Sequence, residues 1–232
     1  NRGGLTPRQR FIRASRHDLE GMGLTQAISY SLTTVEKAKQ FQIKPLAEPM
    51  KLDFPMSSDH VATRMNIVSG LLNDIAYNVA RNVDNVALYE EGRVFLPMGD
   101  ERPVEQEHLA AAVTGQMVAN SWNKKDQPAD FFQLKGIVER YLKNMGIAGK
   151  ITYVPTSDRP EMHPGRTADI MVDDQLVGFI GQVHPQTAKE YKIPETYVFE
   201  LNLELLLAAP KIENEYTPIS KYPSITRDIA LL

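Results

Sequence analysis

Cysteine is absent from the 232-residue sequence. This absence excludes disulfide bonds, thiolate metal sites and a cysteine nucleophile. Long apolar runs are also absent: none approaches the roughly 20 residues that cross a bilayer, and no secretion signal begins the chain. We therefore expect a soluble protein with no membrane partner and a cytoplasmic location, which a cysteine-free sequence fits.

The sequence also lacks an excess of positive charge. It has 26 lysines and arginines against 29 aspartates and glutamates, a net charge of −3. This balance argues against a domain whose whole surface grips nucleic-acid phosphates. One local basic stretch runs from Arg2 to Arg16. It fits a solvated helix face or an RNA contact, and the first interpretation is favoured.

Recognisable catalytic motifs are missing as well. The five histidines do not have zinc-site spacing, and neither GxSxG, GxxxxGK[ST] nor GxGxxG occurs. His163 and His184 each precede a proline at an expected strand end, so they fit either a metal pair or two packed corners, of which the corners are favoured. We predict that Gly178 and Gly181 mark a strand with close backbone approach, because no helix start follows them directly.

Two pairs of adjacent carboxylates remain as candidates for acid–base chemistry. Glu90 and Glu91 are expected to point to opposite faces of a strand, and Asp173 and Asp174 to occupy a turn. Neither arrangement brings two carboxylates onto one substrate.

Helix signals are clear at three places. Thr6 and Pro7 begin one helix, which ends near Gly21 or Gly23, and Asp130 caps another that Gly146 ends. A third helix carries Ile67, Leu71, Ile75 and Val79 at four-residue spacing, and we expect its N-cap among Ser57, Ser58 and Asp59. Shorter helices are expected after Thr33 or Thr34 and after Pro185.

Strand signals cluster between these helices. They comprise TQAISYSL, NVALYEEGRVFLP as two runs around Gly92, HLAAAVTGQ, ITYV, TADIMVDDQLVGFIGQV as a hairpin, and TYVFELNL. Short turns join several of them, which favours a mostly antiparallel sheet with helices packed against it. The sequence therefore predicts an α+β fold.

Seven blocks together resemble the β subunit of bacterial phenylalanyl-tRNA synthetase. They are GLTQAISYSL, TRMNIVSGLLNDIAYN, LYEEGRVF, DFFQLKGIVE, HPGRTADI, GFIGQVHP and KYPSITRDIALL. The resemblance implies the class II aminoacyl-tRNA synthetase sheet, antiparallel and flanked by helices. It also implies three parts: the tail of a preceding domain (1–25), a class II-like domain (26–209), and a linker with the first strand of a truncated ferredoxin-like anticodon-binding domain (210–232).

The resemblance further implies that this domain has lost its chemistry. Active class II enzymes hold ATP with an arginine on their motif 2 strand, and the matching run, Gly92 to Leu96, has a leucine at that position. The run matching motif 3, Tyr197 to Pro210, contains neither glycine nor arginine. We therefore expect no catalytic, cofactor-binding or metal-binding residue in this chain, and we assign ATP and magnesium to the whole enzyme.

By the same resemblance, the partners are a catalytic α subunit, in a heterotetramer of two α and two β subunits, and tRNA for the whole enzyme. The candidate interface residues are Arg64, Asn66 and Asn73 on the third helix and its approach, with His163 and Arg166 in the HPGR segment. Ordinary packing within the domain is the alternative for each of them.

Two other functions stay open. One is a class II-like paralogue with its own ATP or amino-acid site, in which Arg93 or Arg166 replaces the missing arginines. The other is a tRNA-binding module built on the basic stretch near the N-terminus.

Overall fold

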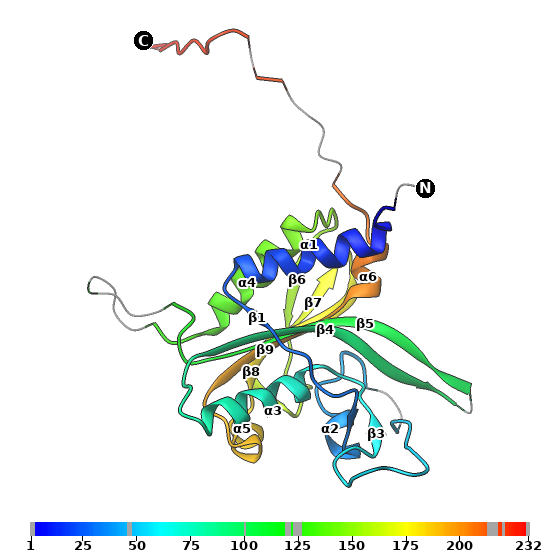
Figure 1. Cartoon of the computed structure of the whole chain (residues 1–232). Coiled ribbons are helices and arrows are strands. Elements are labelled where there is room, and N and C mark those ends of the chain that lie inside the picture. The colour runs from blue at the N-terminus through cyan, green and yellow to red at the C-terminus, as the bar shows by residue number, and fades with distance from the viewer. Residues whose placement is uncertain are drawn as a thin grey trace.

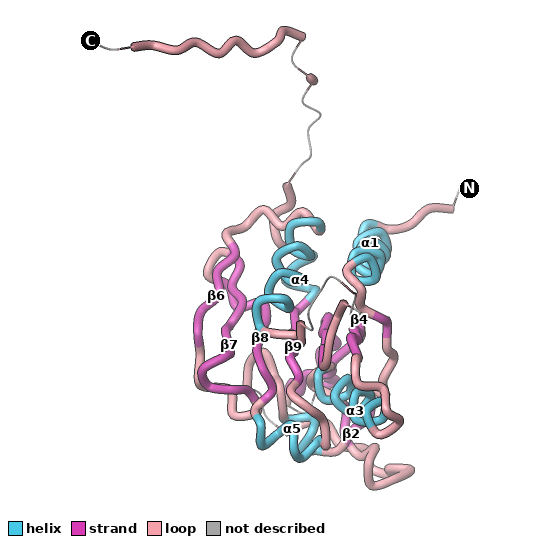
Figure 2. The backbone as a smooth tube through the Cα atoms, turned by 90° about the vertical axis from the view of Figure 1, so that its left-hand side faces the viewer, coloured by secondary structure: helices cyan, strands magenta, loops and turns pink. Residues whose placement is uncertain are grey.

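The computed structural model describes residues 3–45, 48–99, 101–118, 122, 127–212, 218–219 and 221–230. Its helices are α1 (Pro7–Gly21), α2 (Val35–Lys39), α3 (Val68–Val79), α4 (Phe131–Asn144), α5 (Pro185–Tyr191) and α6 (Leu203–Ala208). Its strands are β1 (Thr25–Gln26), β2 (Leu32–Thr33), β3 (Ala62–Thr63), β4 (Val86–Met98), β5 (Glu101–Thr114), β6 (Ile151–Pro155), β7 (Met162–Val172), β8 (Gln175–Val183) and β9 (Thr196–Asn202). Figures 1 and 2 show their arrangement.

A seven-stranded sheet in the order β1-β4-β5-β9-β8-β7-β6 forms the centre of the domain. Its pairs are antiparallel except for β1 with β4, and β2 and β3 form a separate antiparallel pair. Hairpins join β4 to β5 and β7 to β8. The predicted α+β fold with a mostly antiparallel sheet is confirmed.

Helices cover both faces of the sheet, with α1, α4 and α6 on one side and α2, α3 and α5 on the other (Figure 1). The strands supply a core to each side because successive residues of a strand point in opposite directions. On the central strand β9, Phe199 packs in the core beneath α1 and α4, and its neighbour Val198 packs in the core beneath α3. A strand buried on both faces reads as a continuous apolar run, which describes TYVFEL.

Local signals place two helix starts and one helix end correctly. The Thr6 hydroxyl accepts a hydrogen bond from the Gln9 amide at 3.2 Å, and the Asp130 carboxylate accepts one from the Gln133 amide at 2.7 Å. Gly146 ends α4 with φ of +73°, a conformation that glycine adopts without strain.

The start of α3 differs from the prediction. Ser57, Ser58 and Asp59 lie well before it, and the helix begins at Val68. The backbone amides of Ile67 and Val68 instead donate to the Glu200 carboxylate at 2.9 and 3.1 Å. A partner distant in sequence thus satisfies two of the first amides, and the side-chain oxygen of Asn66 accepts a hydrogen bond from a third, the Ser69 amide, at 2.8 Å.

Strand β4 also differs, since it continues through Gly92 rather than dividing there. A Cβ atom at this position would overlap the guanidinium of Arg64, so the glycine makes room for that side chain and does not break the strand. In TQAISYSL, only the two ends form strands, and residues 27–31 between them are irregular.

The predicted close approach at Gly178 and Gly181 is confirmed. A Cβ atom at Gly178 would overlap the backbone oxygen of Glu200, and one at Gly181 would overlap that of Arg166. The hairpin predicted at Asp173 and Asp174 is present, with φ of 48° and 64°. Positive φ at both central residues is the requirement of a type I′ turn.

The expected domain division stays a prediction, and the packing of α1 argues against a boundary at residue 25. Leu19 of α1 is fully buried in the same core as α4. At the other end, the Ala148 amide donates to the Pro210 carbonyl at 3.0 Å. Residues 223–230 form no strand with any described part of the chain, and the rest of the expected linker and final strand falls partly outside the described residues.

Candidate functional site

Leu96 of β4 faces a cavity of about 200 Å³ on the α3 side of the sheet. Its lining is mixed: apolar side chains such as Met65, Leu176 and Leu205 alternate with polar ones, which are Gln42, Lys44, Gln106, His108, Gln175 and Asn202. The described residues that line it include one lysine, Lys44, and no arginine. The position at which the resemblance requires an ATP-holding arginine therefore carries a leucine, and no arginine in the described lining takes its place.

A buried polar pair lies beside this cavity. His108 of β5 and Glu200 of β9 are buried, and their Nδ1 and Oε1 atoms are 2.7 Å apart. The second oxygen of Glu200 accepts the two amide hydrogen bonds at the start of α3. The carboxylate therefore has a partner on each oxygen and anchors a helix.

Arg159 holds a loop over the same face of the sheet. Its guanidinium donates to the backbone oxygens of Gln42 and Ile43 at 2.6 and 3.0 Å and to the Asp169 carboxylate at 2.8 Å. It also stacks on the Phe179 ring, 4.5 Å from the ring centre. These contacts fix the loop after α2 across the face where the cavity lies.

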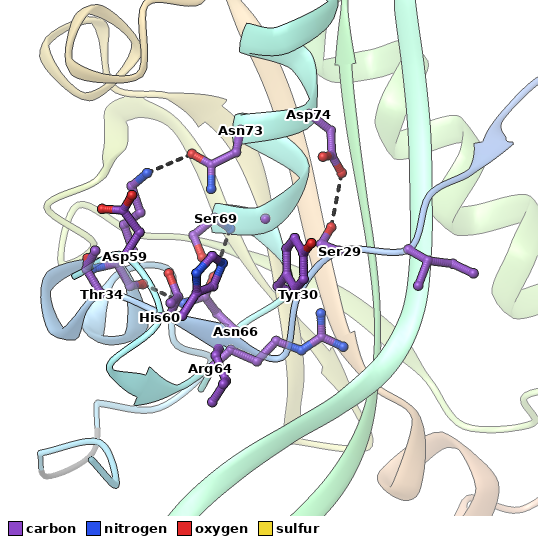
Figure 3. A pocket seen from close by; sticks show the side chains of 15 residues that line it. Ser29, Tyr30, Thr34, Asp59, His60, Arg64, Asn66, Ser69, Asn73 and Asp74 are labelled. Atoms are coloured by element: carbon purple, nitrogen blue, oxygen red, sulfur yellow. Dashed lines mark hydrogen bonds between the residues drawn. The ribbon is translucent and has the colours of Figure 1, made fainter. Parts of the chain in front are cut away.

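A second cavity, of about 350 Å³, lies between α3 and the segments 28–34 and 59–66 (Figure 3). Three predicted interface residues line it. Arg64 makes a buried ion pair with Glu90 at 2.7 Å, and the Asn66 amide nitrogen donates to the Lys37 carbonyl at 2.9 Å. Asn73 is exposed and accepts a hydrogen bond from the Lys37 side chain at 2.7 Å.

The other two predicted interface residues lie on β7, away from this cavity. Arg166 is exposed, donates to the Gln182 side chain at 2.8 Å, and borders a different cavity of about 570 Å³ beside α4. His163 accepts a hydrogen bond from the Gly165 amide. The five residues therefore form two groups, and their role at an interface stays a prediction.

Arg93 and Arg166 do not converge on one nucleotide site. They lie on β4 and β7, which three other strands separate in the sheet. Arg93 is directed to Glu105, at 2.7 Å. The two arginines therefore cannot act together at one site, and a paralogue that uses Arg93 or Arg166 alone stays a prediction.

The described residues contain no group of three or more metal-ligating side chains. His163 and His184 each accept a hydrogen bond from an amide two residues further along the chain, at Gly165 and Gln186. The adjacent carboxylates behave as predicted: Glu90 pairs with Arg64 on one face of β4, and Glu91 pairs with Arg16 of α1 on the other. Within the described part of the chain, no helix has the length and apolarity to cross a membrane.

The basic stretch near the N-terminus is partly neutralised. Arg8 contacts Glu204 at 2.7 Å and Glu107 at 3.3 Å, and Arg16 contacts Glu91 at 2.8 Å. Arg2 lies outside the described residues. Ion pairs with the sheet and α6 thus give this stretch a structural role, which weakens its interpretation as an RNA contact.

Sequence reasoning missed Glu200, and a signal for it existed. Glu200 is the one charged residue in the buried strand β9. A carboxylate in such a strand requires internal hydrogen-bond partners. The pattern could have shown that Glu200 binds something, but not that its partner is the start of α3.

The sheet order and its covering helices are those of class II aminoacyl-tRNA synthetases. Two structures of pyrrolysyl-tRNA synthetase from Desulfitobacterium hafniense superpose with TM-scores of 0.64 and 0.61, at 16% and 15% sequence identity. The first superposition covers 85% of this chain and 67% of the other, and the second covers 87% and 68%. The class II fold expected from the resemblance is confirmed.

Within that class, the chain belongs to the family of phenylalanyl-tRNA synthetase β-chain CLM domains, whose family model matches residues 1–203. Phenylalanine–tRNA ligase β subunits are 59% identical in Lactiplantibacillus plantarum, 50% in Bacillus subtilis and 47% in Latilactobacillus sakei, each over 99% of this chain. The chain spans 28 to 29% of the length of these relatives. The family expected from the seven sequence blocks is confirmed.

Proposed function

We propose that this domain is a non-catalytic module of the β subunit of phenylalanine–tRNA ligase and supports assembly with the catalytic α subunit. The observation that carries the proposal is the position of Leu96. It faces a cavity whose described lining has no arginine, and an aliphatic side chain cannot stabilise the charge that gathers on the α-phosphate during adenylate formation.

Two further observations support a domain without its own nucleotide site. The cavity at Leu96, about 200 Å³, is smaller than the roughly 300 Å³ at which ligand pockets begin. The loop that Arg159 fixes through Gln42 and Ile43 also covers this face. A single leucine-to-arginine change would therefore leave the nucleotide without space.

In the proposed assembly, two α and two β subunits form the enzyme in the cytoplasm. The α subunit attaches phenylalanine to tRNA with ATP and magnesium, and this domain provides surface for packing. The cavity bordered by Arg64, Asn66 and Asn73 is the surface we assign to the α subunit. His163 and Arg166 form a separate candidate contact on β7.

Pyrophosphate exchange dependent on phenylalanine tests the absence of catalysis. We expect no exchange from the purified whole β subunit, and exchange once the α subunit is added. A Leu96→Arg variant of the β subunit should also be inactive alone, because the loop after α2 still covers the face. Exchange by the β subunit alone, abolished by a change at Arg93 or Arg166, would instead establish the paralogue with its own site.

A further inference from the structure

The mouth of the cavity in Figure 3 carries two exposed apolar side chains. Ile28 and Tyr30 lie on the irregular segment between β1 and β2, and 88% and 78% of their surfaces are exposed. The Tyr30 ring contacts the His60 ring edge-on at 4.8 Å, so it has a supported orientation. Two exposed apolar side chains that line one polar cavity are typical of a surface that a protein partner covers.

Asp74 of α3 lies in the same cavity without a cation. Its carboxylate is half-buried and accepts a hydrogen bond from the Ser29 hydroxyl at 3.0 Å. No lysine, arginine or histidine nitrogen among the described residues is within 4.0 Å of it. Burial is the main cause that raises the pKa of Asp74, and the nearby Glu90 carboxylate raises it further.

The positive charges around this cavity are already engaged. Arg64 is paired with Glu90, at 2.7 Å. The Lys37 ammonium donates to the side chain of Asn73 and lies over the Tyr191 ring, 5.1 Å from its centre. Asp59, which also lines the cavity, has no cation within 4.0 Å in the described part of the chain. Neither Asp59 nor Asp74 is therefore paired with a cation that lines the cavity.

We propose that this cavity receives a basic side chain from a protein partner, which pairs with Asp74 while adjacent apolar residues of that partner pack on Ile28 and Tyr30. The inference rests on the proposed function, and it assigns this contact to the α subunit. Nucleic acid is disfavoured, because the carboxylates at Asp59 and Asp74 repel phosphate. A guanidinium or ammonium group would gain a charge-assisted hydrogen bond from Asp74 and a cation–π contact from Tyr30.

Binding of the whole β subunit to the α subunit tests this contact. Asp74→Asn keeps the shape and the Ser29 hydrogen bond but removes the charge, so we expect affinity to fall at least about tenfold and to depend less on salt. Ile28→Ser should weaken binding roughly tenfold without changing the salt dependence. Asp174→Asn, the same change in the exposed β7–β8 turn, is the matched control and should bind like the unmodified protein.

Two results separate this inference from the proposed function. If the unmodified β subunit fails to bind the α subunit, the proposed function is overturned. If it binds and Asp74→Asn binds equally well, the cavity contact alone is overturned. A change in tRNA affinity with unchanged α-subunit affinity would also overturn it.

A photo-crosslinking residue at position 30 provides a measurement that does not depend on the stability of Asp74→Asn. We expect it to capture an α-subunit peptide that contains arginine or lysine next to apolar residues. Capture of another part of the β subunit, or of a peptide without a basic residue, would contradict the proposal.

Discussion

The carboxylate of Glu200 accepts a hydrogen bond from the Ile67 amide at 2.9 Å, across a separation of 133 residues. Glu200 lies on the central strand of the sheet, and Ile67 immediately precedes α3. This bond therefore attaches the start of the helix to the middle of the sheet. Together with the Asn66 side chain, whose oxygen accepts from the Ser69 amide at 2.8 Å, the Glu200 carboxylate satisfies the first amides of α3.

Replacing Glu200 tests this attachment. Glu200→Ala leaves the Ile67 and Val68 amides and the His108 ring without their buried acceptor, so we expect the free energy of unfolding to fall by about 3 kcal/mol. Urea denaturation monitored by circular dichroism measures the change. Glu190→Ala, on the exposed side of α5, should stay within about 0.5 kcal/mol. Equal stabilities of the two variants would contradict the role of Glu200.

The buried ion pair between Arg64 and Glu90 makes a second prediction. Arg64→Ala leaves a buried carboxylate without its cation, and we expect a loss of about 3 to 5 kcal/mol. Arg93→Ala breaks an exposed pair with Glu105 and should lose less than about 1 kcal/mol. A double-mutant cycle with Glu90→Gln should show strong coupling to Arg64, and additive effects would argue against the pair.

This second prediction affects how Arg64 is tested as an interface residue. A variant that loses stability also loses binding, whether or not the side chain contacts a partner. Stability must therefore be measured before any loss of α-subunit binding is assigned to Arg64.

Two glycine-to-alanine changes should have opposite effects on the free energy of unfolding. At Gly178 the new Cβ atom would overlap the Glu200 carbonyl, so we expect a loss of about 1 to 3 kcal/mol. At Gly136 in α4 nothing lies within 4 Å of the added atom, and alanine should stabilise the helix by about 0.5 to 1 kcal/mol. Thermal melting of both variants checks the pair, and destabilisation at Gly136 would show that its surroundings are more crowded.

The pH dependence of stability should contain a contribution from Glu91. Burial raises its pKa above the ordinary value of 4.5, despite the opposing effects of the Ser15 hydroxyl and the Arg16 guanidinium. Between 4.5 and the raised pKa, the folded state binds more protons than the unfolded state. The free energy of unfolding contributed by Glu91 therefore falls as the pH rises through this window.

Glu91→Gln removes that contribution. We expect the variant to lose less stability than the unmodified chain as the pH rises from about 4 to about 7, measured by urea denaturation at each pH. Glu190→Gln, an exposed control, should leave the slope of stability against pH unchanged. If Glu91→Gln also leaves that slope unchanged, the Glu91 side chain does not titrate in this range.

Much of the fold is predictable from the sequence, because its signals are local. Thr6, Asp130 and Gly146 mark helix ends through hydrogen bonds and backbone angles that involve neighbouring residues. The Asp173–Asp174 turn also depends on its own two residues. By contrast, although Asn66 is a local cap for the Ser69 amide, the Ile67 and Val68 amides at the start of α3 are explained by Glu200, and Gly92 is explained by Arg64. Those partners are distant in sequence, so a local pattern carries no trace of the contact.

The features of the candidate site also fall into those that the sequence predicts and those that only the folded chain shows. The significance of Leu96 follows from comparison of one strand with an active synthetase, so the sequence suffices for that expectation. Asp74 stands on the polar flank of an amphipathic helix, where most aspartates are solvated, and only the folded chain brings Ser29 and Glu90 beside it. The separation of His163 and Arg166 from the other interface candidates likewise depends on the sheet order.

The two edges of the seven-stranded sheet are poor templates for further strands. At one edge, β1 pairs with Leu88 and Tyr89 of β4, and further along β4 the Phe95 amide already donates to the Arg64 carbonyl. At the other edge, β6 is five residues long and ends at Pro155, which has no amide hydrogen to donate. Short and proline-terminated edges resist pairing with strands from other molecules. In the proposed contact, the domain would therefore present Ile28 and Tyr30 to the α subunit, while these edges resist edge-to-edge aggregation of subunits that have not yet assembled.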